Sequence, residues 1–238
     1  MARHGKRYEA ARAAINPETV YDPSDAVRMI KEQEITRFDP TIEVHIRLGV
    51  NVRHAEDQLR GTISLPHGTG SDVRVAVFAQ GDAARAAEEA GADYVGAEDL
   101  AAKITDEGLS DFDVAIATPD MMAVVGKLGR VLGPSGKMPN PKSGTVTPDV
   151  AKAVGEVKSG KSEYRTDRAG IVHVSIGKRS FEHQQLLDNY LAIFDEILRV
   201  KPASAKGQYV RSISMAQTMG PGIGIDPAVS GAEREAAA

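Results

Sequence analysis

The sequence contains no cysteine and no tryptophan, and only 5% of its 238 residues are aromatic. Without cysteine there is no disulfide framework and no thiolate zinc site, which fits a reducing cytosol. No apolar run approaches the ~18–20 residues that a membrane span needs, and the N-terminal residues MARHGKRYEAAR lack the apolar core of a signal peptide. We therefore expect a cytoplasmic protein with no membrane partner, of one large or two small domains.

The chain also lacks an excess of positive charge, because its formal net charge is −4. That total hides a strong pattern: residues 125–168 carry nine Lys or Arg against four Asp or Glu, whereas residues 82–120 carry two against eleven. The N-terminal residues 1–14 add four cations against one acid. A basic surface beside an acidic one can bind a polyanion locally, so the net charge does not exclude a nucleic-acid partner.

Two stretches near the ends of the chain alternate apolar and polar residues, which is typical of half-buried strands. Residues 171–177 do so with Val172, Val174 and Ile176 on one face. Residues 41–50 do so over a longer run, with one face made of Ile42, Val44, Ile46, Leu48 and Val50. We also predict strands at residues 60–65 and 209–215, the second being the last element before a loose tail.

Three helices are predicted in the same outer segments. Residues 3–14 form a basic helix or arm, and the sequence DPSDAVRMIKEQ predicts a helix capped by Ser24. The strongest periodicity covers residues 181–200, where the i, i+3, i+4, i+7 stripe consists of Leu187, Tyr190, Leu191, Phe194, Ile197 and Leu198.

Between these segments lies a middle part bounded by two glycine-containing breakers, PHGTGS at 66–71 and SGKS at 159–162. Its predicted strands are nearly all apolar, as in a parallel sheet buried on both faces, and they alternate with helices. In chain order we expect a strand at 73–79, a helix at 82–90 capped by Asp82, a strand at 92–95, a helix at 98–106, a strand at 113–117 and a helix at 149–158. Because each outer segment is short of a core alone, we expect the two to fold together with this α/β middle inserted.

The stretch LGRVLGPSGKMPNPKSGTVT, residues 128–147, is rich in glycine and contains three prolines and no acid. Proline fixes φ and lacks an N–H, and glycine permits positive φ, so we expect neither a helix nor a regular sheet to run through it. Open backbone amides and the cations Lys127, Arg130, Lys137 and Lys142 would suit phosphate groups. A solvated surface loop has the same composition, but long loops within compact domains are usually functional.

Patterns of enzymes and metal sites fail on the residues present. The phosphate-loop pattern G-x-x-x-x-G-K-[ST] would need glycine at Val131 and a hydroxyl at Met138. No two histidines form H-x-x-x-H, and His45 and His173 fall on polar strand faces as solvated or hydrogen-bonded side chains. We therefore expect no enzyme, no metal and no cofactor. The alternative is an α/β small-ligand or phosphate-compound binding protein or enzyme that uses the glycine-rich loop.

Residues suited to nucleic acid are spread along the outer segments. Phe38 follows Arg37 and could stack on an unpaired base, although a core position at the start of a strand is equally compatible. Ser212 and Ser214 share one face of the last predicted strand, and hydroxyls can bond phosphates, bases or the ribose 2′-OH. Thr218-Met219-Gly220 then combines a hydroxyl with a glycine that permits close backbone approach.

Together these pieces resemble the bacterial family of large-subunit ribosomal protein 1, whose members belong to the mobile stalk beside the tRNA exit site. The resemblance covers about residues 3–225. Its motifs here are RFDPTIEV (37–44), LRGTISLPHGTG (59–70), GKLGRVLGPSGKMPNPKSGTVT (126–147), YRTDRAGIVHVSIGK (164–178) and MAQTMGPG (215–222).

The resemblance implies a two-domain α/β (α+β) protein. Residues 1–66 and 162–238 would form a discontinuous split α+β sandwich, and residues 67–161 an inserted Rossmann-like parallel α/β domain. It also implies no catalytic activity, a monomer off the ribosome, and three RNA partners: large-subunit rRNA, its own operon mRNA, which it would repress, and exit-site tRNA, whose movement and release it would assist.

The resemblance further implies, by matching positions, which residues contact RNA. Secondary contacts from the inserted domain would come from Lys137 and Lys142. The main contacts would be Phe38, Thr41, Arg165, Asp167, Ser212, Thr218, Met219 and Gly220.

Overall fold

The computed structural model describes residues 5–54, 57–106 and 111–228 and divides the chain into two compact units. The outer unit takes the residues up to Gly70 and those from Ser162 onward, and the inserted unit is Ser71–Lys161. Each unit has its own buried hydrophobic residues. The predicted fold class is confirmed, since one unit contains an antiparallel sheet and the other a parallel α/β sheet.

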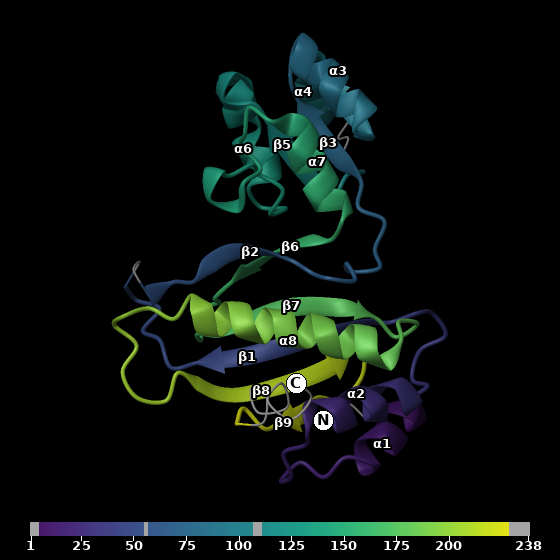
Figure 1. Ribbon diagram of the computed structural model, residues 1–238. Coiled ribbons are helices and arrows are strands. Elements are labelled where there is room, and N and C mark those ends of the chain that lie inside the picture. The colour runs from purple at the N-terminus through teal and green to yellow at the C-terminus, as the bar shows by residue number, and fades with distance from the viewer. Residues whose placement is uncertain (1–4, 55–56, 107–110, 229–238) are drawn as a thin grey trace. The chain divides into compact units, whose positions relative to one another are not determined.

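The outer unit is built on a four-stranded antiparallel sheet in the order β7-β1-β8-β9 (Figure 1). The two alternating stretches form one neighbouring pair of its strands, β1 and β7, because alternate residues of a strand point to opposite faces and one face can be buried. The strands are β1 (Thr41–Leu48), β7 (Ile171–Lys178), β8 (Val210–Gln217) and β9 (Ile223–Ile225). A separate two-stranded sheet joins β2 (Arg60–Ser64) to β6 (Lys161–Arg165).

The prediction that the strand at 209–215 is the last element is wrong, because β9 follows it. β9 has three residues, too few for alternation to identify, and it pairs with β8 so that Met215 faces Ile223. β8 also runs on to Gln217, which brings the turn at Thr218-Met219-Gly220 directly onto the end of the sheet.

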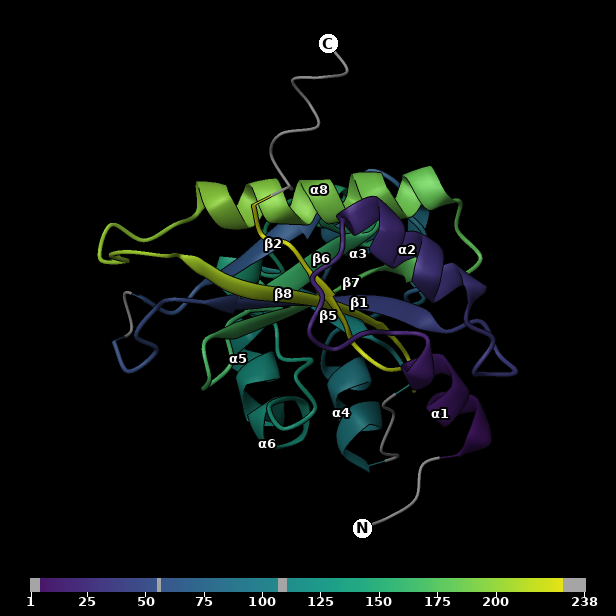
Figure 2. The ribbon, with the colours of Figure 1, turned by 90° about the horizontal axis from the view of Figure 1, so that it is seen from below.

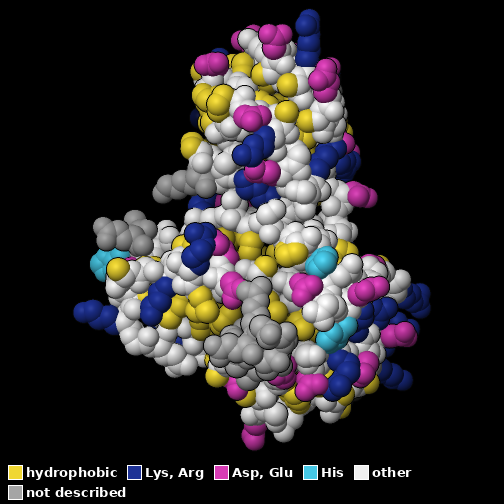
Figure 3. All heavy atoms as spheres, viewed as in Figure 1, with side chains coloured by type: hydrophobic (Ala, Val, Ile, Leu, Met, Phe, Trp, Pro, Cys, Tyr) yellow, Lys and Arg dark blue, Asp and Glu magenta, His cyan; other side chains and the backbone are white. Residues whose placement is uncertain are grey.

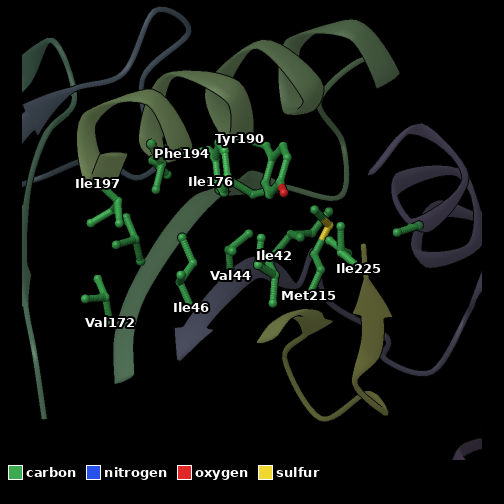
Figure 4. Packing of buried hydrophobic residues seen from close by; sticks show 14 of the residues in the cluster. Ile42, Val44, Ile46, Val172, Ile176, Tyr190, Phe194, Ile197, Met215 and Ile225 are labelled. Atoms are coloured by element: carbon green, nitrogen blue, oxygen red, sulfur yellow. The ribbon is translucent and has the colours of Figure 1, made fainter. Parts of the chain in front are cut away.

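Two helices cover one face of this sheet, α2 (Pro23–Glu32) and α8 (His183–Arg199), as Figure 2 shows. A third helix, α1 (Lys6–Ala13), precedes them. Figure 4 shows Tyr190, Phe194 and Ile197 of α8 directed at the sheet side chains Ile42, Val44, Ile46, Val172, Ile176 and Met215. The buried face of this sheet thus meets α2 and α8, and on the opposite face Glu43, Arg47 and His173 are exposed.

The predicted apolar stripe of α8 is partly wrong. Leu198 is 43% exposed, whereas Leu186 and Ile193, which the stripe omits, are fully buried. Leu186, Tyr190, Ile193 and Ile197 form one i, i+4, i+7, i+11 row, and this row faces the sheet. Because apolar residues cover more than one side of this helix, periodicity alone could not say which side packs on the sheet.

Two of the predicted helix caps are also wrong. The side chain of Asp22, and not that of Ser24, caps α2 by accepting from the Ser24 amide at 3.0 Å. Pro23 occupies the first helical position, which its fixed φ favours, so the cap is Asp22, two residues before the predicted Ser24. At α3 (Asp82–Glu89) the N-cap is Gly81, and Asp82 is the first helical residue, with no side-chain cap bond.

The inserted unit contains a three-stranded parallel sheet in the order β4-β3-β5. Alternate residues of its strands enter two separate clusters: Ala76 and Phe78 face one, and Val75 and Val77 face the other. Burial on both faces explains the unbroken apolar runs. The strands are β3 (Val75–Phe78), β4 (Tyr94–Gly96) and β5 (Val114–Ala117), and the longer helices are α3 (Asp82–Glu89), α4 (Glu98–Asp106) and α7 (Val150–Lys158).

The stretch from Pro119 to the glycine-rich loop forms a chain of single turns. In order these are η2 (Pro119–Met121), α5 (Met122–Val125), η3 (Gly126–Leu128), α6 (Gly129–Leu132) and, after a gap, η4 (Pro141–Ser143). As expected, no helix runs through residues 128–147, although the single turn α6 forms at the start, where burial of Leu128 and Leu132 outweighs the helix-disfavouring glycines. Among the described residues, no helix combines the length and apolarity that crossing a membrane requires.

Candidate nucleic-acid interface

Five of the residues predicted to contact RNA lie at one end of the outer sheet. We call Phe38, Thr41, Thr218, Met219 and Gly220 the turn set. The carbonyl of Thr41, the first residue of β1, accepts from both the amide of Thr218 at 2.9 Å and its hydroxyl at 3.2 Å. The Thr41 hydroxyl accepts from Lys178 Nζ at 2.8 Å. These backbone and side-chain hydrogen bonds hold Thr41 and Thr218 together at the end of the sheet.

The turn itself presents Met219 to solvent. The amide of Gly220 donates to the carbonyl of Gln217 at 2.7 Å and closes the turn. Met219 has φ of 63°, the one positive value among the described non-glycine residues, and is 71% exposed. A left-handed conformation costs an L-residue about 1–2 kcal/mol, and an exposed methionine gains nothing from a core in return. Strain together with an exposed apolar side chain indicates a binding surface.

A hollow of about 470 Å³ lies beside Phe38. Phe38 is 54% exposed, which decides between the two roles left open for it in favour of a surface position. Lys31, Arg37 and Arg179 line the same hollow, together with the acids Glu34 and Asp39. An exposed ring beside cations suits a base and its phosphate. Sequence reasoning missed Lys31 and Arg179, which come from α2 and from the residue after β7, because only the fold brings them to Phe38.

The other three predicted residues lie at the opposite end of the sheet, and we call Arg165, Asp167 and Ser212 the arginine set. Arg165 ends β6 and is exposed, and Ser212 of β8 is exposed opposite Arg47 of β1. Asp167 has a structural task as well: its Oδ1 accepts from the amides of Ala169 and Ile171, each at 2.8 Å. The Ile171 amide is the main cause that holds the pKa of Asp167 below its usual value.

Arg165 shares a hollow of about 540 Å³ with two further arginines, Arg53 and Arg168. Three guanidinium groups around one hollow offer donors for phosphate oxygens in the planar, bidentate geometry that arginine favours. Arg168 belongs to the YRTDR motif, so its spacing from Arg165 was a usable signal. Arg53 lies in the segment after β1, and no local sequence pattern predicted that it would line this hollow.

Between the two sets runs the uncovered face of the sheet. Glu43, His45 and Arg47 of β1 point to this face, with Ser214 opposite His45 on β8 and His173 opposite it on β7. From Thr41 to Arg47 the strand rises about 20 Å at about 3.3 Å per residue. The turn set and the arginine set are therefore the two ends of one polar surface. By contrast, the α8 side of the outer unit, seen in Figure 3, intersperses acidic and basic side chains.

The predicted secondary contacts lie on the glycine-rich loop of the inserted unit. Lys137 Nζ donates to the carbonyl of Phe112 at 2.5 Å and lies 5.1 Å from the centre of its ring. To reach a phosphate, Lys137 would have to give up both contacts. Lys142 lies in η4, and its side chain is outside the described part of the structure. Exposed cations on the same stretch are Lys127 and Arg130.

The expectation of open amides in this loop is wrong. Amides of Gly136, Lys137, Asn140, Ser143, Gly144 and Thr145 all donate to oxygens within residues 132–145. The loop then returns to the sheet, where the Ala117 amide bonds the Thr145 carbonyl at 2.9 Å. These amides already have hydrogen-bond acceptors within the loop, so they need no ligand. They are therefore not open to the oxygens of a bound phosphate. Among the described residues, no three His, Cys, Asp or Glu side chains cluster as a metal site would require.

Comparison with known proteins places this chain among ribosomal proteins. Residues 30–221 match the model of the ribosomal protein L1p/L10e family. The large ribosomal subunit protein uL1 of Chloroflexus aurantiacus is 54% identical over 229 residues, which is 95% of this chain and 97% of that protein. The protein of the same description from Rubrobacter xylanophilus is 54% identical over 231 residues, 97% of this chain and 99% of that protein.

Proposed function

This chain belongs to the ribosomal protein L1p/L10e family, and from that premise we propose that it is a large-subunit ribosomal protein that binds rRNA with the uncovered face of its outer sheet. One observation carries the proposal: the eight main candidate residues, scattered over residues 38–220, gather at the two ends of a single polar sheet face. A sheet face whose exposed side chains are polar, with arginines gathered at one end, has the character of an RNA-binding surface.

We assign the turn set to the recognition of an unpaired or distorted RNA segment. Phe38 stacks on a base, with Arg37 beside it for the phosphate. Lys31 and Arg179 line the same hollow but already donate to the carbonyls of Phe181 and Gln33. Met219 packs on a base or sugar, while Gly220 lets the RNA backbone come close. The Thr41 hydroxyl, which accepts from Lys178, donates to a phosphate or ribose oxygen, and the Thr218 hydroxyl, which donates to the Thr41 carbonyl, accepts from a ribose 2′-OH.

The arginine set neutralises phosphates at the other end of the face. Arg165 does so with Arg53 and Arg168, and the Ser212 hydroxyl adds a bond to the RNA backbone. Asp167 acts chiefly by holding the turn that positions these arginines, since its Oδ1 already accepts from two amides. From the inserted unit we propose Lys142 as a secondary phosphate contact, and Lys137 only if it leaves Phe112.

We extend the proposal to the three roles that family membership suggests. The chain would sit at the mobile stalk of the large subunit, assist the movement and release of exit-site tRNA, and repress its own operon by binding the mRNA. A single RNA surface supports the last role, because rRNA and mRNA would then compete for it. The chain would be a monomer off the ribosome, and its work would be binding, without catalysis.

Footprinting of the full chain on large-subunit rRNA and on its own operon transcript tests this proposal. Protection of one similar structure in both RNAs is expected, with an affinity that falls steeply as salt rises. The competing function, a phosphate-compound binder that uses the glycine-rich loop, predicts a higher melting temperature with a nucleotide and no protected RNA. The internally bonded amides of that loop disfavour the competitor.

The outer unit should fold and bind rRNA without the inserted unit. All buried residues of the outer cluster lie between Ile15 and Ile225 outside Ser71–Lys161, so replacing residues 71–161 by a short glycine linker removes no core side chain. We expect a cooperative unfolding transition and an rRNA affinity within about threefold of the full chain, with a weaker salt dependence. A shortened chain that folds but binds no rRNA would place the main site in the inserted unit.

Thr218→Ala should separate binding from stability. The Thr41 carbonyl keeps the Thr218 amide as a donor after the hydroxyl is lost, so the free energy of unfolding should fall by at most about 1 kcal/mol. The rRNA affinity should fall by about 1–3 kcal/mol, or roughly 5- to 150-fold. Filter binding at fixed salt measures this, with Thr218→Ser, which retains the hydroxyl, as the matched control. Equal affinity of the alanine and serine variants would remove this hydroxyl from the interface.

A further inference from the structure

Two histidines meet at the centre of the uncovered sheet face. His45 of β1 and His173 of β7 are direct cross-strand partners, and their Nδ1 atoms lie 2.8 Å apart. The two rings are edge to face, with centroids 4.9 Å apart and an angle of 64° between their planes. His45 is half-buried and His173 is exposed. Two nitrogens at this distance share one proton in an N–H···N bond, because two lone pairs or two N–H groups would repel.

The neighbouring carboxylate defines where that proton belongs. Asp167 Oδ2 lies 3.5 Å from His173 Nε2, which favours the proton of His173 on Nε2 and leaves its Nδ1 as the acceptor. His45 then donates from Nδ1, and its Nε2 is the free base of the pair. Burial, and secondly His173, lower the pKa of His45, while Glu43 opposes them. The lowered pKa favours the neutral form of His45 in the free protein.

The pair also lies where RNA must cross the sheet. His45 is four residues along β1 from Thr41 of the turn set and two from Arg47, whose partner Ser212 belongs to the arginine set. Asp167 of the arginine set contacts His173. An RNA that engages both ends of the face passes over the two imidazoles.

We propose that the His45–His173 pair is an RNA contact that takes up a proton when an RNA phosphate lies over it, so that RNA affinity rises as the pH falls. This inference rests on the proposed function. The charged side chains that share the face are Glu43 and Arg47 from β1 and Asp167 and Arg165 from the arginine set. β7 also contributes Lys178, whose Nζ donates to the Thr41 hydroxyl at the turn-set end of the face. Ser175 of β7 and Ser212 and Ser214 of β8 do not titrate.

The sign of the effect follows from linkage. A phosphate beside the pair stabilises the imidazolium and raises the pKa of His45 in the complex above its lowered value in the free protein. Affinity is then constant above the pKa of the complex, rises as the pH falls below it, and levels off below the pKa of the free protein. Because the two rings share a proton already, the pair accepts about one more, which limits the slope to about tenfold per pH unit.

The test measures binding of the full chain to total large-subunit rRNA from about pH 8 to about pH 6 at constant ionic strength. The parent should gain about three- to tenfold in affinity over this range. His45→Gln and His173→Gln should lose most of this gain, each variant being compared with its own affinity at pH 8. His67→Gln is the control, because His67 pairs with Asp188 of α8, the helix that covers the opposite face, and it should keep the gain of the parent.

Each outcome decides between the proposals. A gain of the parent that persists in both variants, or a parent with no gain, overturns the role of the pair while leaving rRNA binding intact. Absence of rRNA binding at every pH overturns the proposed function itself. If a variant does not fold, NMR titration of the imidazoles in the parent replaces it. The pKa of His45 should then rise on addition of rRNA, and an unchanged or lowered pKa would refute the inference.

Discussion

Gly220→Val should reduce the affinity for large-subunit rRNA by about 100-fold or more, equivalent to about 3 kcal/mol. A Cβ at this position would lie 2.6 Å from Gln217 Cγ and 3.1 Å from the Gln217 carbonyl oxygen. The side chain of Gln217 is held in place, because the residue is 3% exposed and its side-chain Nε2 donates to the Gln33 carbonyl at 3.2 Å. The turn must therefore move, and it carries Thr218 and Met219 out of position.

The same segment supplies a matched control for this substitution. A Cβ at Gly222 would have no atom within 4 Å, so Gly222→Val changes the same residue types two positions away without a collision. We expect this variant to bind rRNA within about threefold of the parent. Both variants should retain the unfolding transition of the parent within about 2 kcal/mol, because the turn lies at the edge of the core. If Gly220→Val and Gly222→Val bind equally well, the turn is not part of the interface.

Sequence reasoning identified the elements whose signal is local. The alternation of residues 41–50 and 171–177 and the apolar runs of the middle part each correspond to a strand of the predicted kind, because burial on one face or two leaves its period in the sequence. Sequence reasoning failed where the structure of a segment depends on contacts with residues distant in the sequence. The side of α8 that packs inward, the strand β9 and the bonding of the glycine-rich loop are all decided by contacts with distant segments.

The candidate interface shows the same division. Motif positions supplied the turn set and the arginine set, but the cations around them, Lys31, Arg179 and Arg53, join only through the fold. His45 and His173 are 128 residues apart, and each alone is an ordinary polar position on a strand. Their contact depends on the register of β1 against β7, which includes a bulge at Ile42/Glu43 that no spacing rule could provide.

That bulge leads to the substitution with the largest expected effect on stability, Asn189→Ala. The register of β1 against β7 skips Ile176, and Asn189 Nδ2 of α8 donates to the orphaned Ile176 carbonyl at 2.7 Å. The same amide donates to Gly68 O at 3.0 Å, and Asn189 Oδ1 accepts from the His67 amide at 3.1 Å. Asn189 is fully buried, so one side chain ties α8 to the bulge and to the segment that leaves the outer unit.

Asn189→Ala should lower the free energy of unfolding of the outer unit by about 3 kcal/mol. The substitution leaves two carbonyls and one amide without a hydrogen-bond partner and creates a cavity. Asn189→Asp should be at least as harmful, since a carboxylate cannot donate to Gly68 and Ile176 and would be buried as a charge. The exposed Gln184→Ala on the same helix, which loses one bond to Asp188, should cost about 0.5 kcal/mol or less.

Urea unfolding followed by hydrogen exchange reports the two units separately, with the earliest loss of protection expected in β7 and at His67–Gly70. Because Asn189 lies on the helix side of the sheet, the folded fraction of Asn189→Ala should bind rRNA like the parent. Unchanged stability, or a loss of affinity in a fully folded variant, would contradict this account of the residue.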